Sequence, residues 1–353
     1  MKNNYTLFEQ VLHRLSVGNT LFNEISFDLE KSLYLAKTSY LNPKIIFISG
    51  LARSGTTALL NHLVNAGIGH SLTYQDLPFL FMPNLSARWK GIPKTTEPKE
   101  RAHGDNILIN EDSPEAIDEI FWKTQTANKY IQDKKLSIHT LTENDLIAYK
   151  NFIQLHLGKS NKTTYLTKNN NTILRLNSLV NQSTIDNHFL FAIREPFSHA
   201  CSLHKQHVQF SRLHKNDAFS QHYFNSLGHH EFGLNLKSFD LQNEYLTLEL
   251  NSLNPMNLDY WLVTWLNYYQ YLWANISDKF LLVDFTDLCA QPNEVMKTIQ
   301  QHWGLNAPEL EIKPYSAPAY PSSAESHSAD LLSTCQAQYL KLKALCLVSP
   351  SSE

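Results

Sequence analysis

The segment KIIFISG, residues 44–50, constrains the fold of this chain more than any other stretch. Its β-branched and aromatic residues form an apolar run that is too short for a typical helix and ends in glycine, which predicts a strand buried on both faces. From Ser54 the period changes, because leucines recur at helical spacing up to Gly67. The sequence therefore predicts a strand, a glycine-containing turn and a helix.

The same alternation recurs along the chain, and it predicts an α/β fold with a parallel β-sheet flanked by helices. We expect further strands at 164–167, 188–193 and 279–284, and further helices at 173–180, 196–209 and 292–303. The N-terminal region, 1–43, is expected to be helical and to pack outside the sheet. At the other end, 306–353 should form a Pro- and Ser-rich connector and a final helix over 329–347.

Two long stretches interrupt the alternation. Residues 76–123 are charged and contain proline, until the residues at 112–114 predict the start of a helix that runs through Lys123. Residues 210–258 are polar and rich in histidine. Long insertions of this kind often act as lids or binding loops. We therefore expect residues 1–353 to form a single domain enlarged by two insertions, rather than two domains.

Composition limits the partners of the chain. Thirty basic residues stand against 33 acidic ones, a formal charge of −3, which disfavours nucleic acid as a partner. The four cysteines form no C-x-x-C pair, which excludes a zinc ribbon and is typical of a reduced compartment. The N-terminus does not have the pattern of a signal peptide, and no apolar run approaches the ~20 residues that span a bilayer. We expect a soluble, cytoplasmic protein.

The turn GLARSGTT, residues 50–57, is suited to holding an anion. The N–H groups of a tight turn and of a helix N-terminus can converge on one negative group. Gly50 and Gly55 have the spacing of a Walker A loop, but Thr56 stands where that loop has its lysine. The cation comes earlier, at Arg53. The alternative is an ordinary turn with a surface arginine.

A second cationic segment follows the strand at 188–193. Arg194 stands at the carboxyl end of this strand and Ser202 lies eight residues later, so both can reach a ligand above the sheet edge. Residues 194–215 hold four basic side chains against one acid, a local exception to the acidic total. The alternative is an ion pair for Arg194 and a solvated helix face for the rest.

Together these segments resemble the sulfotransferases that use 3′-phosphoadenosine 5′-phosphosulfate (PAPS), a family with a P-loop NTPase-like three-layer fold. The family core [KR]-S-G-T-[TS], which binds the 5′-phosphosulfate, matches Arg53, Ser54, Gly55, Thr56 and Thr57. The family's R-x-P, with a serine eight residues after the arginine, binds the 3′-phosphate and matches Arg194 and Ser202. Residues 281–292 are similar to a later family segment, with Phe285 in place of tyrosine. The chain lacks the C-terminal glycine-rich loop of the eukaryotic cytosolic enzymes and looks more like the bacterial type.

The resemblance implies in-line transfer of a sulfuryl group from PAPS to a hydroxyl or amine, with no metal expected. Arg53 is the first candidate for stabilising the departing oxygen, and Lys168, just after a predicted strand, is the second. Asp76 and His103 are the candidates for the base that takes the acceptor's proton. Their alternatives are an aspartate that caps a turn and a surface loop histidine.

The acceptor stays open among small molecules, glycans and lipids, and so does the oligomeric state. Two other functions are weighed: a small-molecule kinase that uses ATP and Mg²⁺, which Thr56 argues against, and a non-catalytic interaction protein with the same fold. A zinc site at the histidine clusters has no defined four-ligand spacing. The aromatic run at 261–273 has helical spacing and predicts a core helix.

Overall fold

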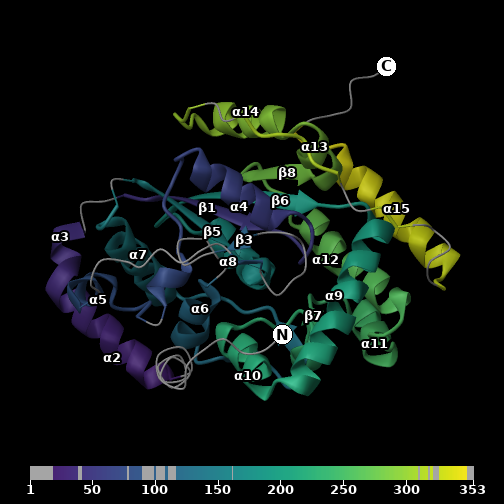
Figure 1. The fold of residues 1–353 in the computed structure, drawn as a ribbon, viewed down its shortest axis with the longest axis horizontal. Coiled ribbons are helices and arrows are strands. Elements are labelled where there is room, and N and C mark those ends of the chain that lie inside the picture. The colour runs from purple at the N-terminus through teal and green to yellow at the C-terminus, as the bar shows by residue number, and fades with distance from the viewer. Residues whose placement is uncertain are drawn as a thin grey trace.

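A four-stranded parallel sheet, in the order β5-β1-β6-β8, forms the centre of the fold (Figure 1). The strands are β1 (Lys44–Ser49), β5 (Thr164–Lys168), β6 (Asp186–Ile193) and β8 (Phe280–Asp284). The computed structural model describes residues 19–38, 42–77, 79–89, 99–100, 108–109, 117–160, 162–308, 311–316, 319–320 and 326–347. The predicted strands are present, and the α/β fold class is confirmed.

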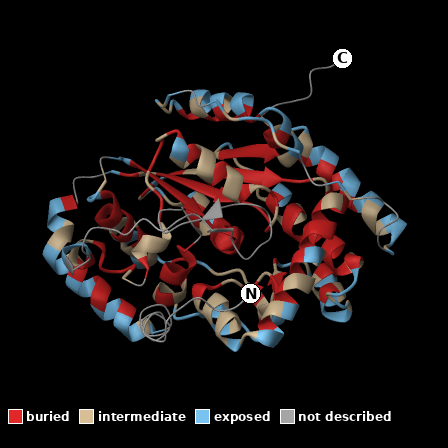
Figure 2. Cartoon of the chain, viewed as in Figure 1, coloured by how far each residue is buried: buried red, intermediate tan, exposed pale blue. Residues whose placement is uncertain are grey.

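Each face of the sheet is covered by helices, because apolar side chains alternate between the two faces of the strands. Ile46 and Ile48 of β1 belong to a cluster with α4 (Thr56–Asn65), α13 (Phe285–Ala290) and α14 (Pro292–Trp303). Phe47 faces the other layer, where a larger cluster joins α7 (Glu143–Leu157), α8 (Leu176–Asn181), α9 (Pro196–Asn216), α12 (Leu258–Ala274) and α15 (Ala329–Lys343). Figure 2 shows the strands buried between these layers.

Most of the aromatic run is core, as predicted: Trp261, Trp265, Tyr268 and Tyr269 of α12 are all buried, while Trp273 near its end is exposed. At the N-terminal side, α2 (Thr20–Glu30), the π-helix η1 (Lys31–Leu35) and α3 (Ala36–Thr38) lie away from the sheet (Figure 1). The remaining elements are η2 (Tyr74–Asp76), α5 (Pro83–Trp89), β2 (Lys99–Glu100), β3 (Leu108–Ile109), α6 (Glu119–Gln125), β4 (Lys135–Ser137), η3 (Asn170–Arg175), α10 (Ala218–Leu227), η4 (Gly233–Asn235), β7 (Ser238–Asp240) and α11 (Glu244–Ser252). None of the helices in the described ranges is long and apolar enough to cross a membrane.

Two sequence expectations concern the long insertions. The helix start expected at 112–114 lies outside the described residues, and the described helix α6 begins at Glu119, after Asp118, whose carboxylate accepts hydrogen bonds from the hydroxyls of Tyr149 and Tyr165. The polar stretch 210–258 is largely helical, since α9 continues to Asn216 and is followed by α10 and α11. The inner face of α9 carries buried polar residues, which made a packed helix resemble a loop in the sequence.

The sheet has an additional partner at its β8 edge. Cys346 forms a parallel bridge with Leu282, and the N–H of Leu347 donates to the Leu282 carbonyl at 3.0 Å. The final helix therefore ends at Lys343, earlier than expected, and the next residues run along the edge strand.

A buried ion pair connects α6 to the carboxyl end of β5. Arg175 Nη2 lies 2.9 Å from Oε1 and 3.0 Å from Oε2 of Glu119. Asn169, directly after β5, donates to Glu119 Oε2 at 2.7 Å, and Tyr130 donates to Oε1. Burial alone would raise the pKa of Glu119, but Arg175 outweighs it and lowers the pKa. The carboxylate is therefore ionised and satisfied inside the core.

Replacing Glu119 with alanine leaves the Arg175 guanidinium buried without its counter-charge. We expect Glu119→Ala to lower the free energy of unfolding by about 3–5 kcal/mol. Asp28→Ala is the control, since Asp28 pairs with Lys31 with a side chain that is 75% exposed, and such pairs contribute less than about 1 kcal/mol. Urea unfolding followed by circular dichroism measures both, and equal losses would contradict the argument.

Candidate functional site

The turn between β1 and α4 has a backbone that depends on glycine. Its φ angles are +153° at Gly50, 71° at Arg53 and +102° at Gly55. A Cβ on Gly50 would lie 2.6 Å from Ser54 Oγ and 2.7 Å from the Ala192 carbonyl oxygen of β6, so only glycine fits there. Gly55 caps α4 without a side-chain hydrogen bond. The turn thus presents the positive end of α4 with no capping side chain over it.

Arg194 connects this turn to the end of β6. Its Nη1 donates to the carbonyl oxygen of Arg53 at 3.1 Å, and its Nε donates to Ser198 Oγ at 3.0 Å. The guanidinium lies over the Phe285 ring, 4.5 Å from the centroid, and the residue is only 3% exposed. Its Nη2 has no hydrogen-bond partner among the described residues. Burial, with a contribution from nearby Arg53, lowers the pKa of Arg194, which marks a buried cation suited to an anionic ligand.

Core side chains from α9 and α12 hold the turn after β1 and the end of β6 in place. Trp265 donates from Nε1 to the Arg194 carbonyl at 3.1 Å, and the Tyr269 hydroxyl donates to the Ala192 carbonyl at 2.9 Å. His199 Nε2 lies 2.7 Å from the Ala52 carbonyl. Burial, aided by Arg194, lowers the pKa of His199 to about 3, so the ring is neutral and Nε2 carries the donated hydrogen.

Lys168 lies at the carboxyl end of β5, in register with Ile48. Because side chains alternate along a strand, Lys168 faces the same side as Leu166, the side that α4 covers. The Ser49 hydroxyl donates to the Asn169 carbonyl at 2.9 Å and holds the two strand ends together. Lys168 is therefore placed at the sheet edge beside the turn.

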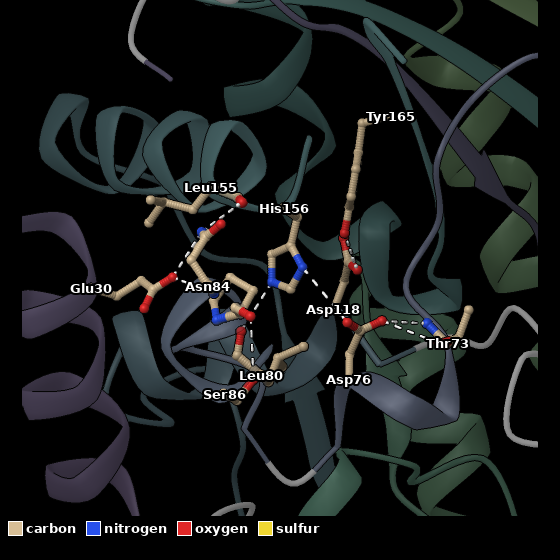
Figure 3. Close-up of polar contacts among 11 residues, drawn as sticks. Glu30, Thr73, Asp76, Leu80, Asn84, Ser86, Asp118, Leu155, His156 and Tyr165 are labelled. Atoms are coloured by element: carbon tan, nitrogen blue, oxygen red, sulfur yellow. Dashed lines mark hydrogen bonds and ion pairs between the residues drawn. The ribbon is translucent and has the colours of Figure 1, made fainter. Parts of the chain in front are cut away.

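Asp76 lies on the outer side of β5, where the bridge between His70 and Tyr165 brings its segment to the sheet. Its Oδ2 accepts from the N–H of Thr73 at 2.8 Å, so the carboxylate closes its own turn (Figure 3). Its Oδ1 is 4.0 Å from Nδ1 of His156. Burial lowers the pKa of His156 to about 3, and its Nε2 bonds the Leu80 carbonyl, so this histidine is neutral.

The structure brings together most of the residues expected to bind a ligand, and it adds others. The turn 53–57, Lys168 and Arg194 lie at the carboxyl ends of three adjacent strands. Ser202 is buried on α9, and the described hydrogen bond of Arg194 goes to Ser198 instead. His103 lies outside the described residues.

Several contributors were missed from the sequence. His199, Trp265 and Tyr269 bond to residues distant in the chain, and the sequence indicated the last two only as core residues of the aromatic run. Ser198 gave no signal, and Phe285 was indicated only by its place in the segment similar to a family motif. Within the described ranges, no group of three or more His, Cys, Asp or Glu side chains could hold a metal ion.

No protein-family model matches this chain, and no curated protein matches it. Among solved structures it is similar to the sulfotransferase STF9 from Mycobacterium avium, with 13% identity and a TM-score of 0.49 over 97% of this chain and 87% of that one. It is also similar to the sulfotransferase STF1 from Mycobacterium tuberculosis H37Rv, with 13% identity and a TM-score of 0.47 over 95% of this chain and 82% of that one. The sulfotransferase domain of the olefin synthase from Synechococcus PCC 7002 matches with 14% identity and a TM-score of 0.31 over 89% of this chain and 91% of that one.

Gly55 and Gly304 allow a matched test of the turn, because both have positive φ. A Cβ on Gly55 would lie 2.7 Å from the Phe285 ring, whereas one on Gly304 would meet nothing within 4 Å. Gly304→Ala should cost about 1–2 kcal/mol for backbone conformation alone. Gly55→Ala should cost about 1–3 kcal/mol more, because Phe285 must move. Chemical denaturation measures both, and equal costs would show that the close approach has no energetic effect.

The neutral state of His199 predicts an acid-dependent loss of stability. The unfolded chain binds a proton at this side chain near its ordinary pKa of 6.5, while the folded protein resists protonation down to about 3. Between these values the folded state loses about 1.4 kcal/mol per pH unit as pH falls. We expect His199→Gln to show a shallower decline in the free energy of unfolding between pH 6 and pH 5 than the parent. His222→Gln, an exposed site on α10, should keep the parent's slope.

Proposed function

We propose that this chain transfers a sulfuryl group from PAPS to a hydroxyl or amine of an acceptor molecule. One observation carries the proposal: Arg194 donates to the main chain of Arg53 while its Nη2 has no partner among the described residues. The two motifs that resemble PAPS-binding segments therefore meet at one place on the sheet edge. A buried guanidinium with an open donor there favours an anionic ligand.

The residues fit the two anionic groups of PAPS. The turn 53–57 would hold the 5′-phosphosulfate, since Gly50 and Gly55 keep the backbone close and leave the N-terminus of α4 without a side-chain cap. Arg194, together with Ser202, would hold the 3′-phosphate. The Phe285 ring under the guanidinium keeps that side chain in place without competing for its hydrogen bonds.

The chemistry asks three things of this chain. PAPS, when bound, supplies a sulfuryl group on a good leaving group. Arg53 and Lys168 are assigned to the negative charge that develops on the departing oxygen, because both lie where the strands end. A base must take the acceptor's proton, and Asp76 and His103 are the candidates from the sequence. Asp76 Oδ2 already accepts from Thr73, so Oδ1, which lies 4.0 Å from Nδ1 of His156, is the oxygen that would act as the base.

The nucleotide is tested by thermal shift. We expect adenosine 3′,5′-bisphosphate to raise the melting temperature clearly more than ADP does, because only the bisphosphate carries the 3′-phosphate assigned to Arg194. Magnesium should not be needed. An equal rise with ADP, or a rise with ATP that depends on Mg²⁺, would support the kinase alternative.

Arg194 is tested by its uncharged counterpart. Arg194→Met should weaken binding of adenosine 3′,5′-bisphosphate at least ~10-fold, as expected for loss of a charged hydrogen bond. Arg212→Met, at an exposed position of the same helix, should bind like the parent. Isothermal titration calorimetry measures both affinities. Unchanged affinity in Arg194→Met, with the protein folded by circular dichroism, would rule out this phosphate site.

A further inference from the structure

Phe285 and Arg194 leave the sheet at neighbouring positions. Asp284 is the last residue of β8 and lies in register with Ile193, the last residue of β6. The residues that follow are therefore Phe285 and Arg194, and the guanidinium carbon of Arg194 lies 4.5 Å from the centroid of the Phe285 ring. This contact supports the cation and leaves its Nη2 without a hydrogen-bond partner among the described residues.

The Phe285 ring also approaches the turn that follows β1. A Cβ on Gly55 would lie 2.7 Å from the ring, so the ring is packed closely against this part of the turn. The ring thus contacts both segments that are assigned to the nucleotide. A guanidinium binds a phosphate best when its planar fork of donors is held in one orientation, because a mobile side chain loses conformational entropy on binding. The place of the ring therefore bears on how well Arg194 can bind a phosphate.

Asp284 fixes the backbone from which this ring projects. Its Oδ1 accepts from the N–H of Thr286 at 2.8 Å and so caps α13, a helix of only 6 residues. A short helix without a cap has unpaired N–H groups and few other bonds to hold its first turn. Since Phe285 is the first residue of α13, loss of the cap would loosen the residue that carries the ring.

The C-terminal helix holds the Asp284 carboxylate in place. Tyr339 of α15 donates from its hydroxyl to Oδ2 at 2.5 Å, and Nζ of Lys343 lies 3.9 Å from Oδ1. Burial, with a contribution from Asp284, raises the pKa of Tyr339, so the hydroxyl keeps its proton and donates it. The Asp284 carboxylate therefore caps α13 with one oxygen and is anchored to α15 with the other.

Asp217 shows what an Asp cap does without such an anchor. It caps α10 through the same kind of bond, from the N–H of Phe219 at 3.0 Å, and its other oxygen accepts from Ser220 within that helix. The other oxygen of Asp284 instead accepts from a residue 55 positions later in the chain. The additional bond connects the ring that supports Arg194 to the C-terminal helix.

We propose that Asp284 is a positioning residue for the 3′-phosphate of the nucleotide, and that Tyr339 assists it from the C-terminal helix. Asp284 determines where the Phe285 ring lies, and the ring keeps the Arg194 guanidinium in the orientation that offers Nη2 to the phosphate. Asp284 and Tyr339 act through Phe285 and Arg194 without contacting the nucleotide. The inference rests on the proposed binding of PAPS and concerns one group of that ligand.

The 3′-phosphate is isolated by two nucleotides that differ only in that group, adenosine 3′,5′-bisphosphate and 5′-AMP. Isothermal titration calorimetry on the full chain measures both affinities, and their ratio is the preference for the 3′-phosphate. We expect Asp284→Ala to reduce this preference about 3- to 10-fold, as for loss of a helix cap, with the affinity for 5′-AMP within about twofold of the parent. Tyr339→Phe should reduce it about 2- to 5-fold. Asp284→Asn should restore most of it, because its amide oxygen can accept from the Thr286 N–H.

Two matched variants control for a general loss of stability. Asp217→Ala removes a helix cap of the same geometry from α10. Tyr149→Phe removes a buried hydroxyl that donates to the Asp118 carboxylate at 2.8 Å, as Tyr339 donates to Asp284. Both variants should lower the melting temperature and keep the parent's preference for the bisphosphate, since a merely structural loss affects the two nucleotides alike.

The outcomes separate this inference from the proposed function. If the parent binds the bisphosphate no better than 5′-AMP, the phosphate assignment of Arg194 is wrong and the inference fails with it. If the parent has the preference and Asp284→Ala keeps it, or loses affinity for both nucleotides equally, the role of Asp284 is wrong and the proposed function stands. An equal loss of preference in the two control variants would also overturn the inference. If circular dichroism shows that Asp284→Ala does not fold, Tyr339→Phe decides, and an unchanged preference in that variant contradicts the proposal.

Discussion

The hydrogen bond from the Arg194 guanidinium to the Arg53 carbonyl determines how the rest of the site is arranged. It connects a buried cation at the end of β6 to the turn that follows β1, at Arg53, a residue with a positive φ. Burying such a charge is costly, and here the main-chain carbonyl, the Ser198 hydroxyl and the Phe285 ring offset part of the cost. An anion bound there would offset more of the cost and would raise the stability of the folded state.

Much of the fold could be predicted because β1, β6 and β8 each contain a continuous apolar run and most helices have a clear apolar stripe, whereas β5, with the sequence TYLTK, gave a weaker signal. The inner face of α9 broke that rule, since His207 and His214 are buried there as acceptors for main-chain N–H groups. The motifs around Arg53 and Arg194 could be predicted for a different reason, since each lies within one short stretch of the sequence. The bonds from Trp265 and His199 join residues far apart in the chain, and no local pattern encodes them.

Buried histidines are a general means of satisfying main-chain groups in this protein. His156, His199 and His230 each bond a carbonyl, and burial lowers the pKa of each ring. A neutral imidazole supplies one donor and one acceptor on a flat, largely apolar ring, so it can enter a core where an amide would leave more groups unpaired. These three histidines therefore serve packing, and an unpartnered ring nitrogen does not by itself mark a functional site, since Nδ1 of His199 also lacks a hydrogen-bond partner among the described residues.

The bridge from Cys346 to Leu282 means that the β8 edge of the sheet is paired by residues synthesised after all four of its strands. The β8 edge receives this partner only after residue 347 has been synthesised, long after β8 itself has left the ribosome. Until then β8 carries open main-chain groups beside apolar side chains, a template that other chains can pair with. The residues that follow α15 thus cover this edge last, because they are the last part of the described chain to be synthesised.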